Sequence, residues 1–205
     1  RTRQDGPAHD GAAGRVNGPK YTSIGDGRAV EGRRAPLVGH ADGHRMRREG
    51  EAGADFALRM ANLLEEEIQR LGTETVMAFV AEPVVGASLG TQPAPMGYFK
   101  RIREICDTYG ILFIADEVMC GMGRTGSLFA LEQEGIAADI TTLAKGLGAG
   151  YQPIAAVMAA ENVIRVIKDG SGTLWNGHTY MSHAIATAGA LAVQKVIEEE
   201  NLLSN

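Results

Sequence analysis

The sequence predicts an α/β protein whose mostly parallel sheet carries helices on both faces. Short apolar runs of strand length alternate along the chain with longer segments in which apolar residues recur at helical spacing. Because buried strands joined by helices need crossover connections, which are almost always right-handed, the strands are expected to run parallel. Ligands of such sheets bind beyond the carboxyl ends of the strands, and charged residues follow several of the apolar runs.

Composition limits the kinds of partner. Of the 205 residues, 44% are hydrophobic and 22% charged, which is typical of a folded globular protein. A net charge of -5 argues against nucleic acid or an anionic membrane as a general partner. No apolar run reaches the about 18 residues of a membrane-spanning helix. Cys106 and Cys120 form no CxxC pair, which excludes a cysteine zinc site and fits a reducing, cytoplasmic location.

Residues 1–50 differ in composition from the rest of the chain. They hold ten Gly and ten Lys or Arg, against six Asp or Glu, and few large aliphatic residues. We expect this Gly- and Arg-rich segment to be poorly ordered or aberrant, because it cannot build its own core. Its arginines are not interleaved with aromatic residues, so a nucleic-acid-binding arm is not favoured. Residues 51–205 are expected to form the folded domain.

The elements of that domain follow in order. Helices are expected over 55–71 and 97–109, each ended by a glycine, Gly72 and Gly110. The apolar runs at 76–81 and 111–115 are typical of strands that are buried on both faces. The remaining expected elements are a short helix near 127–134, strands at 140–143 and 154–159, and helices near 161–168 and 182–200.

Charged residues at the ends of the expected strands are the first candidates for a site. Glu82 follows the first strand, Asp116 the second, and Lys145 lies two residues beyond the third. Neighbouring strands would bring all three to one edge, although acids at such positions also serve as caps or loop hydrogen-bonders and most lysines are solvated. Lys145 stands in an apolar, Gly-rich turn, where the charged amine is disfavoured and Schiff-base chemistry is favoured.

A lysine paired with a strand-end aspartate is what pyridoxal phosphate requires. The cofactor accepts electrons only while its ring nitrogen is protonated, and a buried carboxylate holds that proton. We predict this role for Asp116, with Lys145 as the lysine that binds the cofactor covalently and moves the substrate proton. Val118 would offer an apolar surface to the ring. No metal site is expected, because His178 and His183 lack the glutamate of a metalloprotease motif.

Three stretches, residues 79–86, 115–126 and 144–147, resemble class-III aminotransferases in order and spacing. The similarity runs from about residue 48 to the end of the chain and includes residues 177–180. It implies a partial large domain of a fold-type-I pyridoxal-phosphate enzyme, and a homodimer with active sites at the subunit interface. It also implies that Thr179 reaches the phosphate of the partner subunit's cofactor. Glu82, at the end of the first strand, is counted among the cofactor-binding residues as well.

The resemblance implies transamination between an amine or amino acid and a keto acid or aldehyde. Ala87 stands where many glutamate-using members carry a second glutamate, so glutamate and pyruvate both stay open as amino partners. A Gly-Ser phosphate loop and the family's C-terminal small domain are not found in the sequence. An alternative is therefore a catalytically impaired or inactive truncated homologue that acts only as a structural or partner-binding subunit.

Overall fold

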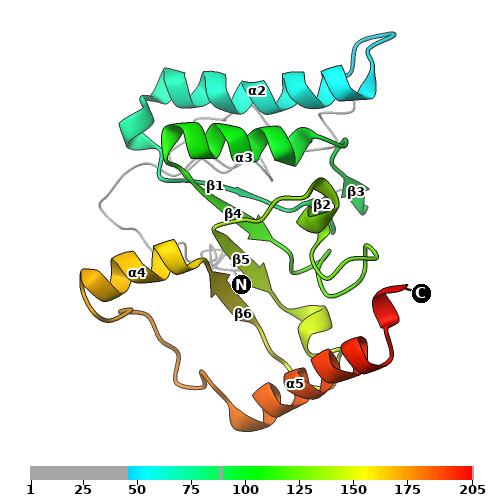
Figure 1. The fold of residues 1–205 in the computed structure, drawn as a ribbon, viewed down its shortest axis with the longest axis vertical. Coiled ribbons are helices and arrows are strands. Elements are labelled where there is room, and N and C mark those ends of the chain that lie inside the picture. Colours follow the sequence, from blue (N-terminus) through cyan, green and yellow to red (C-terminus); the bar gives the residue numbers. More distant parts are fainter. Residues whose placement is uncertain (1–45, 88–89, 205) are drawn as a thin grey trace, which may run out of the picture.

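A four-stranded sheet forms the centre of the fold. The computed structural model describes residues 46–87 and 90–204, so nearly all of the segment expected to be poorly ordered lies outside the described residues. The strands lie in the order β1 (Ala78–Ala81), β4 (Leu112–Asp116), β5 (Ile140–Leu143) and β6 (Ala156–Ala159), as Figure 1 shows. β1, β4 and β5 are parallel neighbours, as the alternation of strands and helices predicts.

The edge strand β6 departs from the parallel arrangement. It pairs antiparallel with β5, with Leu143 opposite Ala156. The connection between these strands is a Gly-rich turn that contains only the 3₁₀ helix η3 (Lys145–Leu147). Parallel strands are usually joined by a crossover that contains an α-helix, and this connection contains none, so the chain returns in the opposite direction.

One face of the sheet is covered by α2 (Gly53–Leu71) and α3 (Tyr98–Tyr109), which lie side by side in Figure 1. Both helices end at the predicted glycines, and Gly110 adopts the left-handed conformation with a φ of 65°. The rings of Phe79 and Phe113 lie 5.7 Å apart, and those of Phe99 and Phe113 lie 5.9 Å apart. The core therefore sits between the sheet and this helical layer.

Side chains alternate along β4. Phe113 and Ala115 are buried against the helical layer, whereas Leu112 and Ile114 on the other face are only half-buried among the described residues. The chain then continues through α4 (Glu161–Asp169) and α5 (Ala184–Glu199), close to the predicted ranges. None of the helices in the described part of the chain is long and apolar enough to cross a membrane.

Several short elements complete the described chain. The helix expected near 127–134 is the 3₁₀ helix η2 (Ala130–Glu134), because the preceding residues form a loop held by its own hydrogen bonds. The hairpin β2 (Val84–Val85) and β3 (Gln92–Pro93) was not predicted, since two-residue strands carry no periodic pattern. The remaining 3₁₀ helices are η1 (Thr73–Thr75) and η4 (Leu202–Ser204).

Candidate active site

The predicted acids and lysine lie at the same edge of the sheet, at the carboxyl ends of the three parallel strands. Glu82 follows β1 and Asp116 ends β4, one position beyond the pair formed by Ala81 and Ala115. Asp116 in turn pairs with Thr142 of β5, and Lys145 begins η3 after that strand. The predicted convergence on one rim is thus a consequence of the strand order.

Asp116 is half-buried, and one of its two carboxylate oxygens is already engaged. Oδ1 accepts a hydrogen bond of 3.0 Å from the backbone N–H of Val118, which bends the chain as it leaves the strand. The other oxygen, Oδ2, has no hydrogen-bond partner among the described residues. The aspartate therefore acts both as the loop hydrogen-bonder considered from the sequence and as an acid with one acceptor oxygen to spare.

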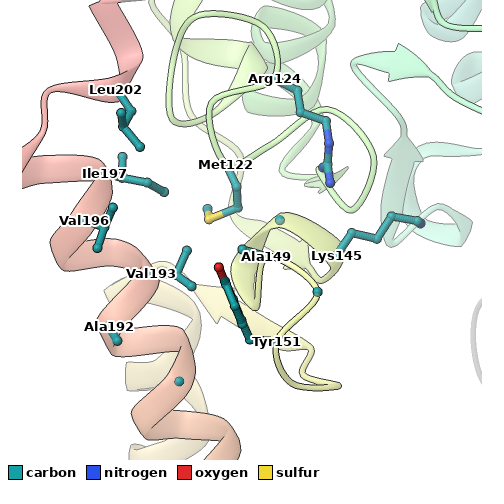
Figure 2. Close-up of a pocket in the computed structure, with 13 residues that line it drawn as sticks. Met122, Arg124, Lys145, Ala149, Tyr151, Ala192, Val193, Val196, Ile197 and Leu202 are labelled. Carbon is teal, nitrogen blue, oxygen red and sulfur yellow. The ribbon is translucent and has the colours of Figure 1, made fainter.

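Lys145 is exposed, which corrects the expectation of an apolar enclosure around its amine. Its turn is tight, as predicted, but the neighbouring residues are mostly glycine and alanine and are too small to cover a long side chain. The amine has no hydrogen-bond or ion-pair partner within residues 46–87 and 90–204. In Figure 2 the side chain extends away from α5.

The backbone around Lys145 is strained. Lys145 has a φ of 40°, and the nearby Met122 and Ala149 have φ values of 61° and 47°. Residues with a side chain rarely adopt this left-handed region, and such strain gathers at functional sites. All three residues line the same pocket, whereas Thr91, Ser182 and Asn201, the other residues with a side chain and a positive φ in the described chain, do not.

A loop from the end of β4 packs directly on the lysine turn. A Cβ atom at Gly146 would lie 2.7 Å from the Cβ of Met122 and 3.4 Å from the guanidinium of Arg124, so only glycine fits there. The guanidinium donates hydrogen bonds of 3.0 Å and 3.4 Å to the carbonyls of Met119 and Gly121. Arg124 therefore ties its own loop together. Figure 2 shows its side chain near the lysine turn.

A pocket of about 1000 Å³ opens between this turn and α5. Its wall is mainly apolar, and the side chains that provide that wall come from the loop, α5 and η4: Met122, Val193, Val196, Ile197 and Leu202. Lys145 and Arg124 are the charged residues of the lining within the described chain. Asp116 does not line this pocket, so the lysine borders it while the acid lies on the strand side of the turn.

Glu82, Thr179 and His183, which the sequence analysis also considered, lie outside the pocket that Lys145 lines. Glu82 is half-buried, and its Oε2 accepts a hydrogen bond of 3.0 Å from the N–H of Gly86, which closes the loop after β1. Thr179 lies in the exposed segment before α5 and does not line the pocket. His183 caps α5, since its Nδ1 accepts from the N–H of Ala186 at 3.3 Å. No group of three or more metal-ligating side chains occurs in the described residues.

Sequence reasoning missed the environment of Glu117. This carboxylate is 1% exposed and accepts hydrogen bonds from the backbone N–H groups of Ala130 at 3.0 Å and Leu131 at 3.2 Å. The thiol of Cys120 donates a third, at 3.0 Å. The alternation of β4 contained a signal, because Glu117 continues the buried set of Phe113 and Ala115.

Comparison with known proteins decides the family. The sequence model of the class-III aminotransferases matches residues 40–205. This chain belongs to the class-III aminotransferases. An aminotransferase of Gibberella zeae is 48% identical over 168 residues, which cover 82% of this chain and 33% of that protein. The vanillin aminotransferase of Capsicum chinense is 44% identical over 156 residues, or 75% of this chain and 34% of that one.

Solved structures of transaminases have the same fold. The omega transaminase from Pseudomonas jessenii in complex with PMP gives a TM-score of 0.73 at 43% identity, over 78% of this chain and 36% of that one. This class-III aminotransferase chain thus spans about a third of the length of the relatives it matches. Within that span the sheet brings Glu82, Asp116 and Lys145 to one edge, whereas Thr179 is not brought into the pocket that Lys145 lines.

Proposed function

We propose that the protein to which this chain belongs carries out pyridoxal-phosphate-dependent transamination between an amine or amino acid and a keto acid or aldehyde. The observation that carries the proposal is the placement of Asp116 and Lys145 at the carboxyl ends of adjacent parallel strands in a class-III aminotransferase chain. Ligands of parallel sheets bind at that edge. A carboxylate and an amine are also the two groups that the cofactor's ring nitrogen and aldehyde require.

The described residues fit the reactive part of the cofactor. Oδ2 of Asp116 is an acceptor without a partner in the described chain. The amine of Lys145 forms no hydrogen bond or ion pair with a described residue. Pyridoxal phosphate, when bound, supplies an electron sink for the carbanion that forms when the substrate loses its α proton. The family resemblance supports Thr179 of a partner subunit as a donor to its phosphate.

Each candidate residue has a defined task in this proposal. Asp116 accepts a hydrogen bond from the protonated ring nitrogen and so keeps that proton in place. Val118, whose N–H fixes the aspartate, gives the ring an apolar contact. Lys145 binds the cofactor and then carries the α proton of the substrate. Glu82 shapes the neighbouring loop of the cofactor-binding edge through its bond to Gly86.

The partners proposed are an amino donor and a keto-acid or aldehyde acceptor, and a second copy of the chain in a homodimer. Residues 51–205 would form part of the cofactor-binding large domain, and the exposed Trp175 and Tyr180 beside Thr179 suit burial against a second subunit. A cytoplasmic location is proposed from the two free, buried thiols. The amino partner stays open between glutamate and pyruvate, as Ala87 indicates.

The test is covalent capture of the cofactor. The purified chain is mixed with pyridoxal phosphate, reduced with borohydride and digested, and the labelled lysine is located by mass spectrometry. We expect the label on Lys145, its loss in Lys145→Ala, and its persistence in Lys195→Ala, which alters an exposed lysine of α5. Absence of the label, or a label that persists in Lys145→Ala, would reject the proposal for this chain and favour the impaired, structural homologue.

A further inference from the structure

A buried carboxylate without a cationic partner lies next to the proposed ring-nitrogen acid. Glu117 follows Asp116 directly, and its side chain is 1% exposed. No Lys, Arg or His in the described chain forms an ion pair with it. Burial of a carboxylate without a cationic partner is costly unless several hydrogen bonds compensate it. Glu117 accepts three such bonds, and the position of their donors shows what the residue holds in place.

The donors lie at the far end of the loop that leaves β4. Oε2 accepts from the N–H of Ala130 and Oε1 from the N–H of Leu131, and these are the first two residues of η2. The residue before them, Phe129, has no capping side chain, so Glu117 satisfies η2 from 13 residues away. The carboxylate therefore links the start of the loop, at Glu117, to its end at η2.

The backbone of Glu117 is held as firmly as its side chain. Its N–H donates to the carbonyl of Thr142 in β5 at 3.0 Å, and its carbonyl accepts from the N–H of Gly121 at 2.9 Å. A Cβ atom at Gly121 would lie 2.8 Å from that carbonyl, so the turn around the glutamate leaves no room for a larger residue. One residue thus joins β5, the first turn of the loop and η2.

Both halves of the proposed site depend on this loop. At its start, the N–H of Val118 holds Oδ1 of Asp116 at 3.0 Å. Further along, Met122 packs against Gly146, the residue after Lys145. A loop released from η2 would loosen the direction of the aspartate and the packing on the lysine turn together.

We propose that Glu117 is a positioning residue, whose buried carboxylate fixes the Asp116–Val118 turn and the loop that packs on the lysine turn. The inference rests on the proposed function for its relevance to the cofactor. Glu67 provides a contrast, because it is also buried, at 6% exposed, but its carboxylate is paired with Arg70 on α2. That glutamate contributes to the fold without touching the proposed site.

The first experiment uses the full chain without cofactor. Amide hydrogen exchange is measured by NMR in wild type, in Glu117→Gln and in Glu67→Gln as the matched buried-carboxylate control. Glutamine has nearly the same shape as glutamate, but an NH2 group replaces one of the two carboxylate oxygens. That NH2 group cannot accept the hydrogen bond that the oxygen accepts. We expect exchange at Val118 and Leu131 to become roughly tenfold faster in Glu117→Gln, the factor that one lost hydrogen bond corresponds to. Glu67→Gln should leave the Val118 amide unchanged.

A second variant breaks the same contact from the other side. Ala130→Pro removes the N–H that binds Oε2 and suits the first helical position, since Phe129 has φ -120° and ψ 139°. Faster exchange at Val118 in this variant would support the proposal. Unchanged Val118 exchange alongside faster Leu131 exchange, or equal acceleration in Glu67→Gln, would overturn it.

The cofactor provides a separate readout. We expect Glu117→Gln to raise the Kd for pyridoxal phosphate roughly tenfold, whereas Glu67→Gln keeps the wild-type Kd. A wild-type Kd in Glu117→Gln would count against the proposal. Failure of the wild-type chain to bind pyridoxal phosphate would instead reject the proposed function, and the exchange rate at Val118 would still decide whether Glu117 positions Asp116.

Discussion

Asp116 of β4 pairs with Thr142 of the parallel strand β5, and Thr142 lies three residues before Lys145 along the chain. The backbone of the sheet therefore sets where the acid and the lysine turn stand relative to each other. The Thr142 carbonyl strengthens this relationship, because it accepts the N–H of the residue after Asp116 at 3.0 Å. Changes to either strand end or to the lysine turn should affect the site in distinct ways.

Asp116→Ala should still allow the cofactor to attach to Lys145, because the aspartate does not take part in that bond. The variant should lose proton transfer by roughly 10²- to 10⁴-fold, since nothing would hold the ring proton in place. The measurement is incorporation of solvent deuterium at the α carbon of an amino donor. Asp107→Ala, at an exposed position on α3, serves as the control, and near-normal incorporation in Asp116→Ala would contradict the assigned role.

Lys145→Gly should be at least as stable as wild type although it loses the cofactor lysine. The φ of 40° costs a residue with a side chain roughly 1–2 kcal/mol, which exceeds or balances the extra backbone entropy of glycine, about 0.5–1 kcal/mol. Urea unfolding measures the difference. By contrast, Lys195→Gly inside α5 should cost about 1 kcal/mol. A similar loss in both variants would mean that the turn at Lys145 is not strained.

Gly146→Ala should displace the lysine turn. The new Cβ atom would lie 2.7 Å from the Cβ of Met122, and overpacking of this kind costs about 1–3 kcal/mol. The thermal unfolding temperature should fall, and the yield of borohydride-fixed pyridoxal phosphate on Lys145 should fall with it. Gly53→Ala, at the first residue of α2, where no atom lies within 4 Å of the added Cβ, is the matched control and should be neutral or slightly stabilising. Unaltered unfolding of Gly146→Ala would show that Met122 moves aside freely.

The two cysteines should be inert in the native chain. Burial raises the pKa of the Cys106 thiol to about 12. Burial, and after it the hydrogen bond to Glu117, also raises the pKa of the Cys120 thiol. At pH 8 neither thiol should react with a disulfide reagent until urea unfolds the chain. Fast reaction of either cysteine at pH 8 without denaturant would contradict this burial.

The same shifts predict how stability depends on pH. A raised pKa in the folded state contributes stability that is fully present below the pKa of the unfolded thiol, about 8.5. That contribution should be lost as the pH rises from there toward about 12. Urea midpoints measured across this range in wild type and in Cys106→Ala should converge at high pH.

The elements with strong periodicity could be predicted from the sequence. α2 and α3 combine an apolar face with a terminal glycine, and β1, β4 and β5 are short apolar runs, so local pattern and final structure agree. The antiparallel direction of β6 and the 3₁₀ form of η2 could not be predicted. Both depend on how a Gly-rich connection folds back, which no periodic signal encodes.

The residue types of the candidate site were determined by the sequence itself: an acid at the end of one strand, a lysine after the next, and the motifs that join them to the class-III aminotransferases. Only the tertiary structure decided which side chains are enclosed. It left Lys145 exposed and buried Glu117, because enclosure depends on contacts between residues far apart in the chain, such as Glu117 with Leu131 and Gly146 with Met122. Strand order and loop closure set those contacts, and neither can be read from local spacing.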